Sequence, residues 1–344
     1  MREIFPKIFG NDHTKARIGT AIKEGTLPHA FLIDGDAGSG KMTLALSIAA
    51  ALNCENLHSE QHSLPCYTCN NCRRILGGGH VDVHVLERGE GRATIGVDEI
   101  KEMRADMFLS ATESDYKIYI VRDAERMTPA AQNALLIVLE EPPANVVIML
   151  LAAGTDRILT TIKSRAQYIS MMRHTPEAVG EYLVRTDAEA ARIERSDPDG
   201  FRLAMASAGG SIGRAKELLT PGRRETISEE RADTVSIVQL YDRTAPYSEL
   251  YSAIMELPKK RPELSDSLER LITATRDLIA LRYDRYAPLS FFLDREEATA
   301  LASRTDTARL FKIYDVIRSA HESNDKNANI TALLSALAAG IKTA

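Results

Sequence analysis

The segment that most constrains the fold of this chain is a glycine-rich loop between a strand pattern and a helix pattern. Residues 29–34 are mainly apolar and predict a short buried strand, and the alanine-rich residues 44–52 predict a helix. Between them, residues 35–41 read Gly-Asp-Ala-Gly-Ser-Gly-Lys. A strand followed by Gly-x4-Gly-Lys and a helix is typical of the phosphate-binding P-loop of a parallel α/β fold. The alternative is a glycine-rich turn with an incidental lysine.

The residues of this loop are candidate nucleotide ligands, because glycines let backbone amides turn toward phosphates and the lysine reaches the terminal phosphate groups. One position departs from the motif. Met42 stands where a serine or threonine hydroxyl would ligate magnesium, and a thioether is a poor ligand for a hard cation. Thr43 is one helical step further, rotated by about 100°. The sequence leaves ATP and magnesium binding open, with these candidate ligands: Gly35, Gly38, Ser39, Gly40, Lys41, Met42 and Thr43.

A second acidic motif follows a later strand pattern. Residues 115–123 are rich in β-branched and aromatic residues and end in Asp123, which can hold magnesium through water. In an active ATPase of this type a glutamate usually comes next and polarises the attacking water, but this chain has Ala124. We expect Glu125 to point to the opposite face, because side chains alternate in extended chain. At two positions, Met42 and Ala124, the side chain therefore lacks the group that ATP hydrolysis would need. The alternative interpretation of Asp123 is a surface acid at the end of a strand.

Four cysteines, the only ones in the chain, lie close together in the sequence at Cys54, Cys66, Cys69 and Cys72. Short spacers between four thiolates are typical of a tetrahedral zinc site, and the polar residues between the last three suit a knuckle. Buried free thiols or a redox pair are the alternatives. Four protein ligands leave no open position, so the predicted zinc is structural and not catalytic.

The length of 344 residues predicts two or three domains, and the net charge of −5 gives no global basic field for nucleic acid. The N-terminus has no apolar signal core, and the longest apolar run, residues 146–153, is too short to span a membrane. Cysteines that act as metal ligands indicate a reducing compartment. We therefore expect a cytoplasmic protein without a membrane partner.

Helix signals organise the remainder of the chain. Thr128 and Pro129 begin a helix that Pro142 and Pro143 end, and residues 146–153 predict another buried strand. Thr175 with Pro176 begins a further helix. From Arg223 to Ala339 there is no glycine, and leucines and isoleucines recur at helical spacing, which predicts a helical bundle.

Taken together, these motifs resemble those of the bacterial DNA polymerase III clamp-loader subunits, members of the AAA+ family. The resemblance covers about residues 1–220 and is only general beyond them. It implies an α/β P-loop AAA+ domain over residues 1–172 with a zinc knuckle inserted at about 54–72. A small helical lid over 173–222 and an all-α collar over 223–344 would follow. The matching segments are the P-loop, the four cysteines, Gly96-Val-Asp-Glu-Ile100, Gln132-Asn-Ala-Leu-Leu136, Leu139-Glu-Glu-Pro-Pro143 and Ser164-Arg165.

Within that family the resemblance is greater to the delta-prime type, a largely non-hydrolysing stator, than to the gamma/tau ATPases. Gamma/tau subunits have Lys-Thr and Asp-Glu where this chain has Lys41-Met42 and Asp123-Ala124. Residues 210–215, Gly-Ser-Ile-Gly-Arg-Ala, are also closer to delta-prime, and Ala166 replaces the cysteine of the family's Ser-Arg-Cys triplet. The alternatives are an active gamma/tau-like ATPase and a P-loop ATPase or zinc adaptor outside replication.

The resemblance also implies roles and partners. Arg165 would be an arginine finger that acts on a neighbour's ATP, Arg214 the sensor arginine of the lid, and Thr155 a weaker candidate for the first sensor position. A surface salt bridge for Arg165 and a helix-surface charge for Arg214 are the alternatives. The chain would join gamma/tau and delta types in a hetero-oligomer within a DNA polymerase holoenzyme. It would help load the sliding clamp on primed DNA, touching DNA mainly through the complex, with little or no ATPase activity of its own.

Overall fold

A computed structural model describes residues 2–89, 92–326 and 328–344. It divides into two compact units. The first contains Met1–His174 and Ser211–Gly213, and the second contains Thr175–Gly210 and Arg214–Ala344. The predicted division into three domains, with boundaries after 172 and 222, stays a prediction.

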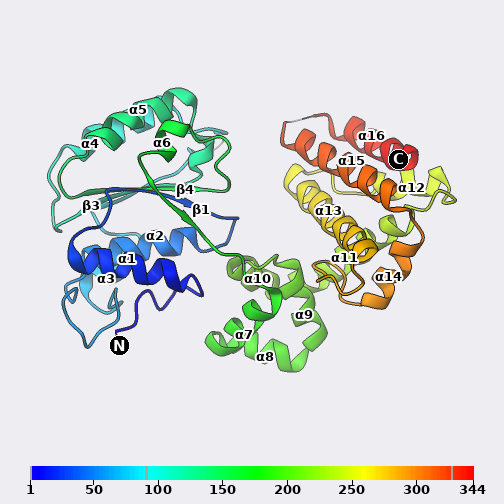
Figure 1. Cartoon of the computed structure of the whole chain (residues 1–344), viewed down its shortest axis with the longest axis horizontal. Helices are drawn as coiled ribbons and strands as arrows, with labels where there is room; N and C mark the ends of the chain where they lie inside the picture. The colour runs from blue at the N-terminus through cyan, green and yellow to red at the C-terminus, as the bar shows by residue number, and fades with distance from the viewer. Residues whose placement is uncertain (1, 90–91, 327) are drawn as a thin grey trace. The chain divides into compact units, whose positions relative to one another are not determined.

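The first unit is built on a five-stranded sheet in the order β2-β3-β4-β1-β5 (Figure 1). Every pairing in it is parallel. All residues of β3 and β4 are buried, as expected when both faces of a parallel sheet are covered. The parallel α/β architecture predicted from the P-loop pattern is therefore confirmed. The strands are β1 Ala30–Asp34, β2 Val83–Leu86, β3 Lys117–Val121, β4 Val146–Ala152 and β5 Gln167–Ser170.

Helices cover the two faces of this sheet, with α1, α2 and α3 on one side and α4, α5 and α6 on the other (Figure 1). Strand residues alternate between two cores, so that Phe31 and Ile33 pack with the α2 side and Leu32 with the α5 side. The helices are α1 Asp12–Glu24, α2 Lys41–Leu52, α3 Asn70–Leu76, α4 Val97–Met107, α5 Pro129–Glu140 and α6 Thr160–Lys163.

The local signals for α5 act as predicted. The Thr128 hydroxyl accepts a hydrogen bond from the Ala131 amide at 3.2 Å, Pro129 occupies the first turn, and the helix ends at Glu140 before the two prolines. The strand before it is shorter than predicted, because β3 ends at Val121 and a 3-10 turn, η1 (Ala124–Arg126), follows.

The second unit is entirely helical in the part that the structure describes. A cluster of buried side chains joins its long helices, and Leu264, Leu268 and Leu271, predicted from helical spacing, are fully buried in it. The functional labels of lid and collar stay predictions. The helices are α7 Pro176–Thr186, α8 Ala188–Ser196, α9 Pro198–Ser207, α10 Ile212–Leu218 (whose first residues belong to the first unit), α11 Arg223–Gln239, α12 Tyr247–Met255, α13 Arg261–Tyr283, α14 Arg295–Ser303, α15 Thr307–Asp325 and α16 Ile330–Thr343.

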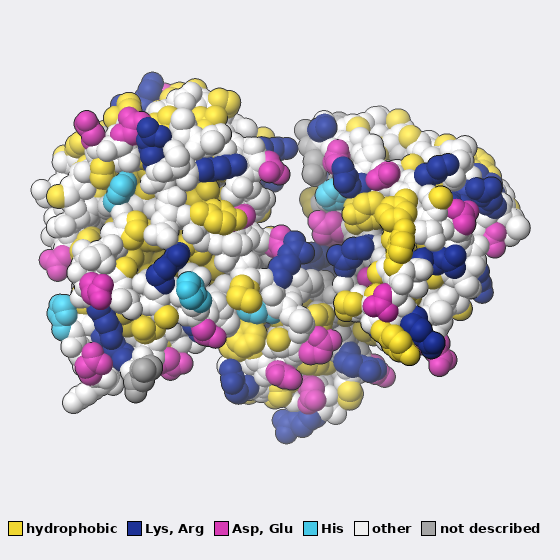
Figure 2. All heavy atoms as spheres, viewed as in Figure 1, with side chains coloured by type: hydrophobic (Ala, Val, Ile, Leu, Met, Phe, Trp, Pro, Cys, Tyr) yellow, Lys and Arg dark blue, Asp and Glu magenta, His cyan; other side chains and the backbone are white. Residues whose placement is uncertain are grey.

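Positive and negative side chains are mixed on the visible surface (Figure 2), in keeping with the absence of a global basic field. On the face shown in Figure 2, Lys and Arg side chains are interspersed with Asp and Glu. Among the described helices, none has the length and apolar character needed to cross a membrane.

Candidate functional site

The phosphate loop connects β1 to α2 at the carboxyl end of the sheet. Gly38 and Gly40 have φ angles of 73° and 92°, a left-handed region that glycine adopts without strain. A Cβ on Gly35 would lie 2.8 Å from Ser39 Oγ and 2.9 Å from Met171 Cβ, so no side chain fits there. The loop leads into the N-terminus of α2, where free amides and the helix dipole favour an anion. The backbone therefore has the form of a phosphate-binding loop.

Lys41 lies against the loop itself. Its ammonium group donates hydrogen bonds to the Gly35 carbonyl and, at 2.8 Å, to the Asp36 carbonyl. Burial lowers the pKa of Lys41, and nearby carboxylates oppose this shift, Glu125 most strongly. The charge that would meet a phosphate is thus already surrounded by acidic groups.

The two residues after the lysine do not present an oxygen at the expected position. Met42 packs against the apolar cluster on the α2 side of the sheet, and Thr43 is exposed. Ser39 Oγ is buried and has no hydrogen-bond partner among the described residues. The structure thus gives the loop a free serine hydroxyl but no hydroxyl at the magnesium position.

Asp123 of the acidic motif lies beyond the end of β3 and is paired with an arginine. Asp123 has a φ of 50°, and its Oδ2 lies 3.2 Å from Arg88 Nε and 3.1 Å from another nitrogen of that guanidinium. Ala124 is fully buried in the core on the α5 side. The position that would hold a water-polarising glutamate therefore has a methyl group inside the protein.

The reasoning from extended chain does not hold for Glu125. Because residues 124–126 form a 3-10 turn, the alternation of extended chain does not apply to them. Glu125 Oε2 accepts a hydrogen bond from the Ala153 amide at 3.2 Å, and Asp34 Oδ1 accepts from the next amide, Gly154, at 2.9 Å. Both carboxylates lie at the turn after β4, and their negative charges attract the Lys41 ammonium and tend to raise its pKa. The sequence signal was available, because a capped helix beginning at Thr128 leaves little room for a strand extending past Asp123.

Arg165 follows the short helix α6, and its side chain is 36% exposed. One guanidinium nitrogen donates to the Thr161 carbonyl at 3.1 Å, and another pairs with Glu140 at 2.8 Å. These contacts hold the side chain at the surface. They are compatible with the alternative of a surface salt bridge as well as with the predicted finger.

The two sensor candidates lie in different places. Thr155 follows Gly154 at the end of β4, and its carbonyl accepts a hydrogen bond from Ile158. Arg214 belongs to the second unit, where its guanidinium lies 3.8 Å from Asp266 and 3.7 Å from Glu269 of α13. The structure thus shows a charged environment for Arg214, and its role as a sensor stays a prediction.

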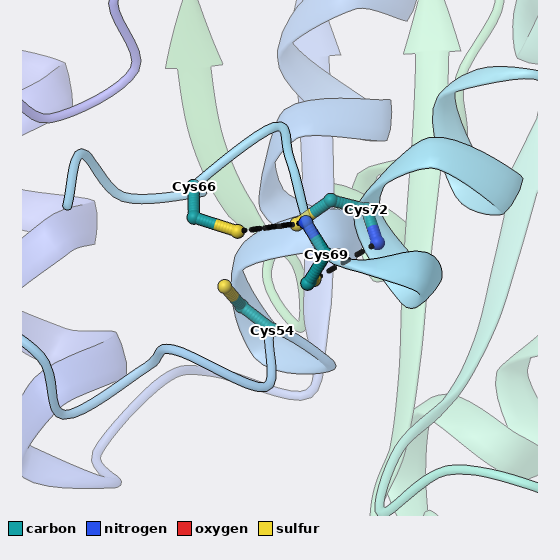
Figure 3. Close-up of side chains that lie close together, drawn as sticks. All are labelled: Cys54, Cys66, Cys69 and Cys72. Atoms are coloured by element: carbon teal, nitrogen blue, oxygen red, sulfur yellow. Dashed lines mark hydrogen bonds between the residues drawn. The ribbon is translucent and has the colours of Figure 1, made fainter.

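The four cysteines converge on one point (Figure 3). Their sulfur atoms all lie within 4.8 Å of one another, and those of Cys66 and Cys72 are 3.8 Å apart. A tetrahedral zinc ion with Zn–S bonds of about 2.3 Å places its sulfurs about 3.8 Å apart, so the cluster fits a metal such as zinc. Cys54 follows α2, Cys66 lies in the loop, and Cys69 and Cys72 belong to the cap and first turn of α3.

The surroundings of the sulfurs favour negative charge. The Cys69 amide donates to Cys66 Sγ at 3.3 Å, the Cys72 amide to Cys69 Sγ at 3.4 Å, and Asn56 Nδ2 to Cys66 Sγ at 3.4 Å. These donors could not be placed from sequence because they depend on the turn geometry. They are the outer partners that orient metal ligands.

Burial tends to raise the pKa of Cys66, but the bonds from Asn56 and the Cys69 amide outweigh it and lower that pKa to about 7. A hydrogen bond with Cys72 lowers the pKa of Cys54 to about 5, and the same contact raises the pKa of Cys72. Of these two contacting thiols, that of Cys54 is therefore the more acidic.

Comparison with known proteins matches these features to one family. A family model described as "DNA polymerase III, delta subunit" matches residues 10–175, which include the loop, the cysteines and Arg165. The Bacillus subtilis DNA polymerase III subunit delta' is 27% identical over 264 residues, 76% of this chain and 75% of that protein.

Relatives of the other type match as well. The B. subtilis subunit tau is 26% identical over 92% of this chain and 58% of its own length. For the Mycobacterium tuberculosis H37Rv subunit gamma/tau, identity is 26% over 89% of this chain and 54% of that protein. The chain therefore spans little more than half the length of its tau and gamma/tau relatives.

A solved structure also matches over most of its length. The crystal structure of a gamma subunit-related protein from Thermotoga maritima aligns with 95% of this chain and 98% of its own, at 18% identity and a TM-score of 0.45. The family match and the relatives of both types support the interpretation of these motifs as those of a bacterial DNA polymerase III clamp-loader subunit.

Proposed function

We propose that this chain is a delta-prime-type subunit of the clamp loader, with little or no ATPase activity, that completes the ATP site of a neighbouring subunit. The observation that carries the proposal is Met42, whose partly buried thioether packs against the apolar cluster and carries no oxygen for magnesium. The burial of Ala124 in the opposite core supports it, because no carboxylate stands there.

In this proposal the partners are gamma/tau and delta-type subunits in a hetero-oligomer in the cytoplasm. The complex loads the sliding clamp on primed DNA, and this chain acts mainly through protein contacts. The relatives of both types support membership of such a complex, and the mixed charge of the visible surface suits protein partners better than a DNA-binding surface.

The four cysteines hold a structural zinc ion in this proposal. All four ligand positions are occupied by thiolates, so the ion has no open position for substrate and serves to fix the loop between α2 and α3.

The test of the subunit's own chemistry is ATP turnover by the isolated chain. We expect turnover at or near background with magnesium present, because missing stabilisation of the transition state by even one group costs on the order of 10²-fold or more in rate. Steady-state hydrolysis at the rate of the isolated ATPase subunits would contradict the stator reading.

The test of Arg165 uses a reconstituted loader in which only this chain is mutated. A guanidinium aimed at a neighbour's γ-phosphate is worth on the order of 10³-fold in rate, so Arg165→Ala removes most of the adjacent site's share of turnover and slows clamp loading. Arg165→Lys rescues little, because an ammonium lacks the planar fork.

The matched control is Arg17→Ala, an exposed arginine on α1, on the other side of the sheet from α6. It should leave turnover unchanged. Unchanged DNA-stimulated turnover in the Arg165→Ala loader would show that the pair with Glu140 is only a surface salt bridge.

A gamma/tau-like ATPase is the second candidate, and Glu125 favours it. This carboxylate attracts the ammonium of the P-loop lysine and accepts a hydrogen bond at the turn after β4. From this place it can orient water near a bound phosphate. Glu125→Gln separates the two candidates. Any turnover of the wild-type chain that disappears in this variant supports the ATPase, whereas identical background rates support the stator.

A further inference from the structure

The second unit contains a groove that the proposed function does not use. Its volume is about 720 Å³, and its walls are α7, α9 and the segment before α14. Phe201, Met205 and Phe292 are buried side chains that line it, and the more exposed Val184, Leu289 and Leu293 complete the apolar surface.

Gly180 shapes the wall formed by α7. A Cβ at this position would lie 3.3 Å from Phe201, which is tighter than most Cβ contacts, and 3.5 Å from Met205, an ordinary van der Waals distance. The glycine stands inside a helix, where it weakens the helix relative to alanine. Its absence of a side chain allows α7 to approach α9 and leaves the groove open above it.

Acidic groups surround the apolar surface. Glu177 and Glu181 lie one turn apart on α7 and therefore share a face, and Glu194 of α8 also lines the groove. None of the three has an ion pair or side-chain hydrogen bond within the described residues. Negative charge in the groove is thus available to an occupant.

The two arginines of the lining are already engaged. Arg202 pairs with Asp199 at 2.5 Å, and the Arg295 guanidinium donates to the carbonyls of Arg285 and Ala287 at 2.8 and 2.9 Å. The described lining has no neutral polar side chain. It can therefore match an apolar surface and positive charges, but it offers little to a polar neutral ligand.

We propose that this groove binds an amphipathic helix of a partner protein that carries lysine or arginine beside its apolar face. Burial of the apolar side chains against Phe201, Met205 and Leu293 supplies the affinity, and the three glutamates fix orientation and exclude acidic segments. The inference does not depend on the proposed function, because it uses only residues of the second unit.

The probe is a labelled helical peptide of leucine and lysine, about 14 residues or four turns long, with leucines on one face. A matched peptide has glutamate in place of lysine. In fluorescence anisotropy with the full chain, the lysine peptide should bind at least about tenfold more tightly than the glutamate peptide. Glu177→Lys with Glu181→Lys should reverse this preference, and Leu293→Asp should weaken binding of the lysine peptide by about tenfold.

The control is Glu102→Lys, an exposed glutamate of α4 in the first unit, which should change neither affinity. Circular dichroism and thermal melting establish that each variant is folded. Equal affinity for both peptides, or the same loss in Glu102→Lys as in the α7 variants, would overturn the proposal. So would a self-association, seen by sedimentation, that Leu293→Asp abolishes, because a second copy would then occupy the groove.

Discussion

The cysteine cluster and the phosphate loop lie at opposite ends of the same helix, α2, and differ in what holds them together. The cluster brings together four cysteine side chains, one just after α2 and three from the loop and first turn of α3, with amide donors to two of the sulfurs. Gly38 and Gly40 give the loop the backbone shape of a phosphate-binding loop, but the side chain of Met42 packs against the apolar cluster on the α2 side of the sheet. A loop shaped by its backbone tolerates changes of side chain, whereas a metal site built from four thiolates depends on each of those side chains.

The largest effect that follows from this comparison concerns the metal. We expect one zinc ion per chain, and we expect Cys72→Ser to lose it, because a serine hydroxyl is a poor substitute for this buried thiolate ligand. Structural zinc contributes several kcal/mol of folding free energy, so the variant should melt well below the wild type. Metal analysis of protein purified without chelator, with thermal unfolding before and after chelation, measures both.

Adding zinc back to the chelated wild type is the control and should restore its melting temperature. A metal content near zero, with four freely reactive thiols, would show that the cysteines do not form a structural zinc site.

The sequence predicted those parts of the molecule whose signals are local. β1, the loop and α2 follow directly from apolar runs and glycines, and Thr128 begins α5 where its side chain can cap the helix. The cysteine cluster was predictable because its ligands are close in the chain. The direction of Glu125 was missed because it depends on where β3 ends, and the capped helix at Thr128 was the one local signal for that end.

Contacts between distant segments could not be predicted either. Asn56 as a donor to Cys66 needs the turn geometry, and the groove needs α7 and α9 beside the segment before α14. No periodicity in one segment reports which other segment packs on it.

A smaller effect is expected for Met42→Thr, which restores a hydroxyl after the lysine. The variant should lose about 1–2 kcal/mol in the free energy of unfolding, because a half-buried thioether leaves the apolar cluster. Urea unfolding measures this loss. Turnover should remain near background, since buried Ala124 still provides no carboxylate. Ala124→Glu is not a usable restoration, because it would place a charge in the core.

Met42→Leu is the matched control, since it keeps the volume and the apolar contacts and should change stability little. If Met42→Thr alone brought hydrolysis to the rate of an ATPase subunit, then one missing hydroxyl would account for the whole difference, and the loop would be a nearly intact catalytic site.

The smallest effect on stability is expected for Lys41→Ala. The ammonium gains two hydrogen bonds to loop carbonyls and the attraction of nearby carboxylates, but burial opposes its charge, so these contributions largely offset one another. We expect the free energy of unfolding to change by about 1 kcal/mol or less. If the loop binds nucleotide, ATP affinity measured by calorimetry should fall clearly in this variant, because the lysine must exchange its carbonyl partners for phosphate oxygens. Lys101→Ala, an exposed lysine of α4 near Asp98, is the control and should alter neither quantity. A large loss of stability in Lys41→Ala would mean that the lysine serves the fold, as the cysteines do, and the contrast between the two ends of α2 would disappear.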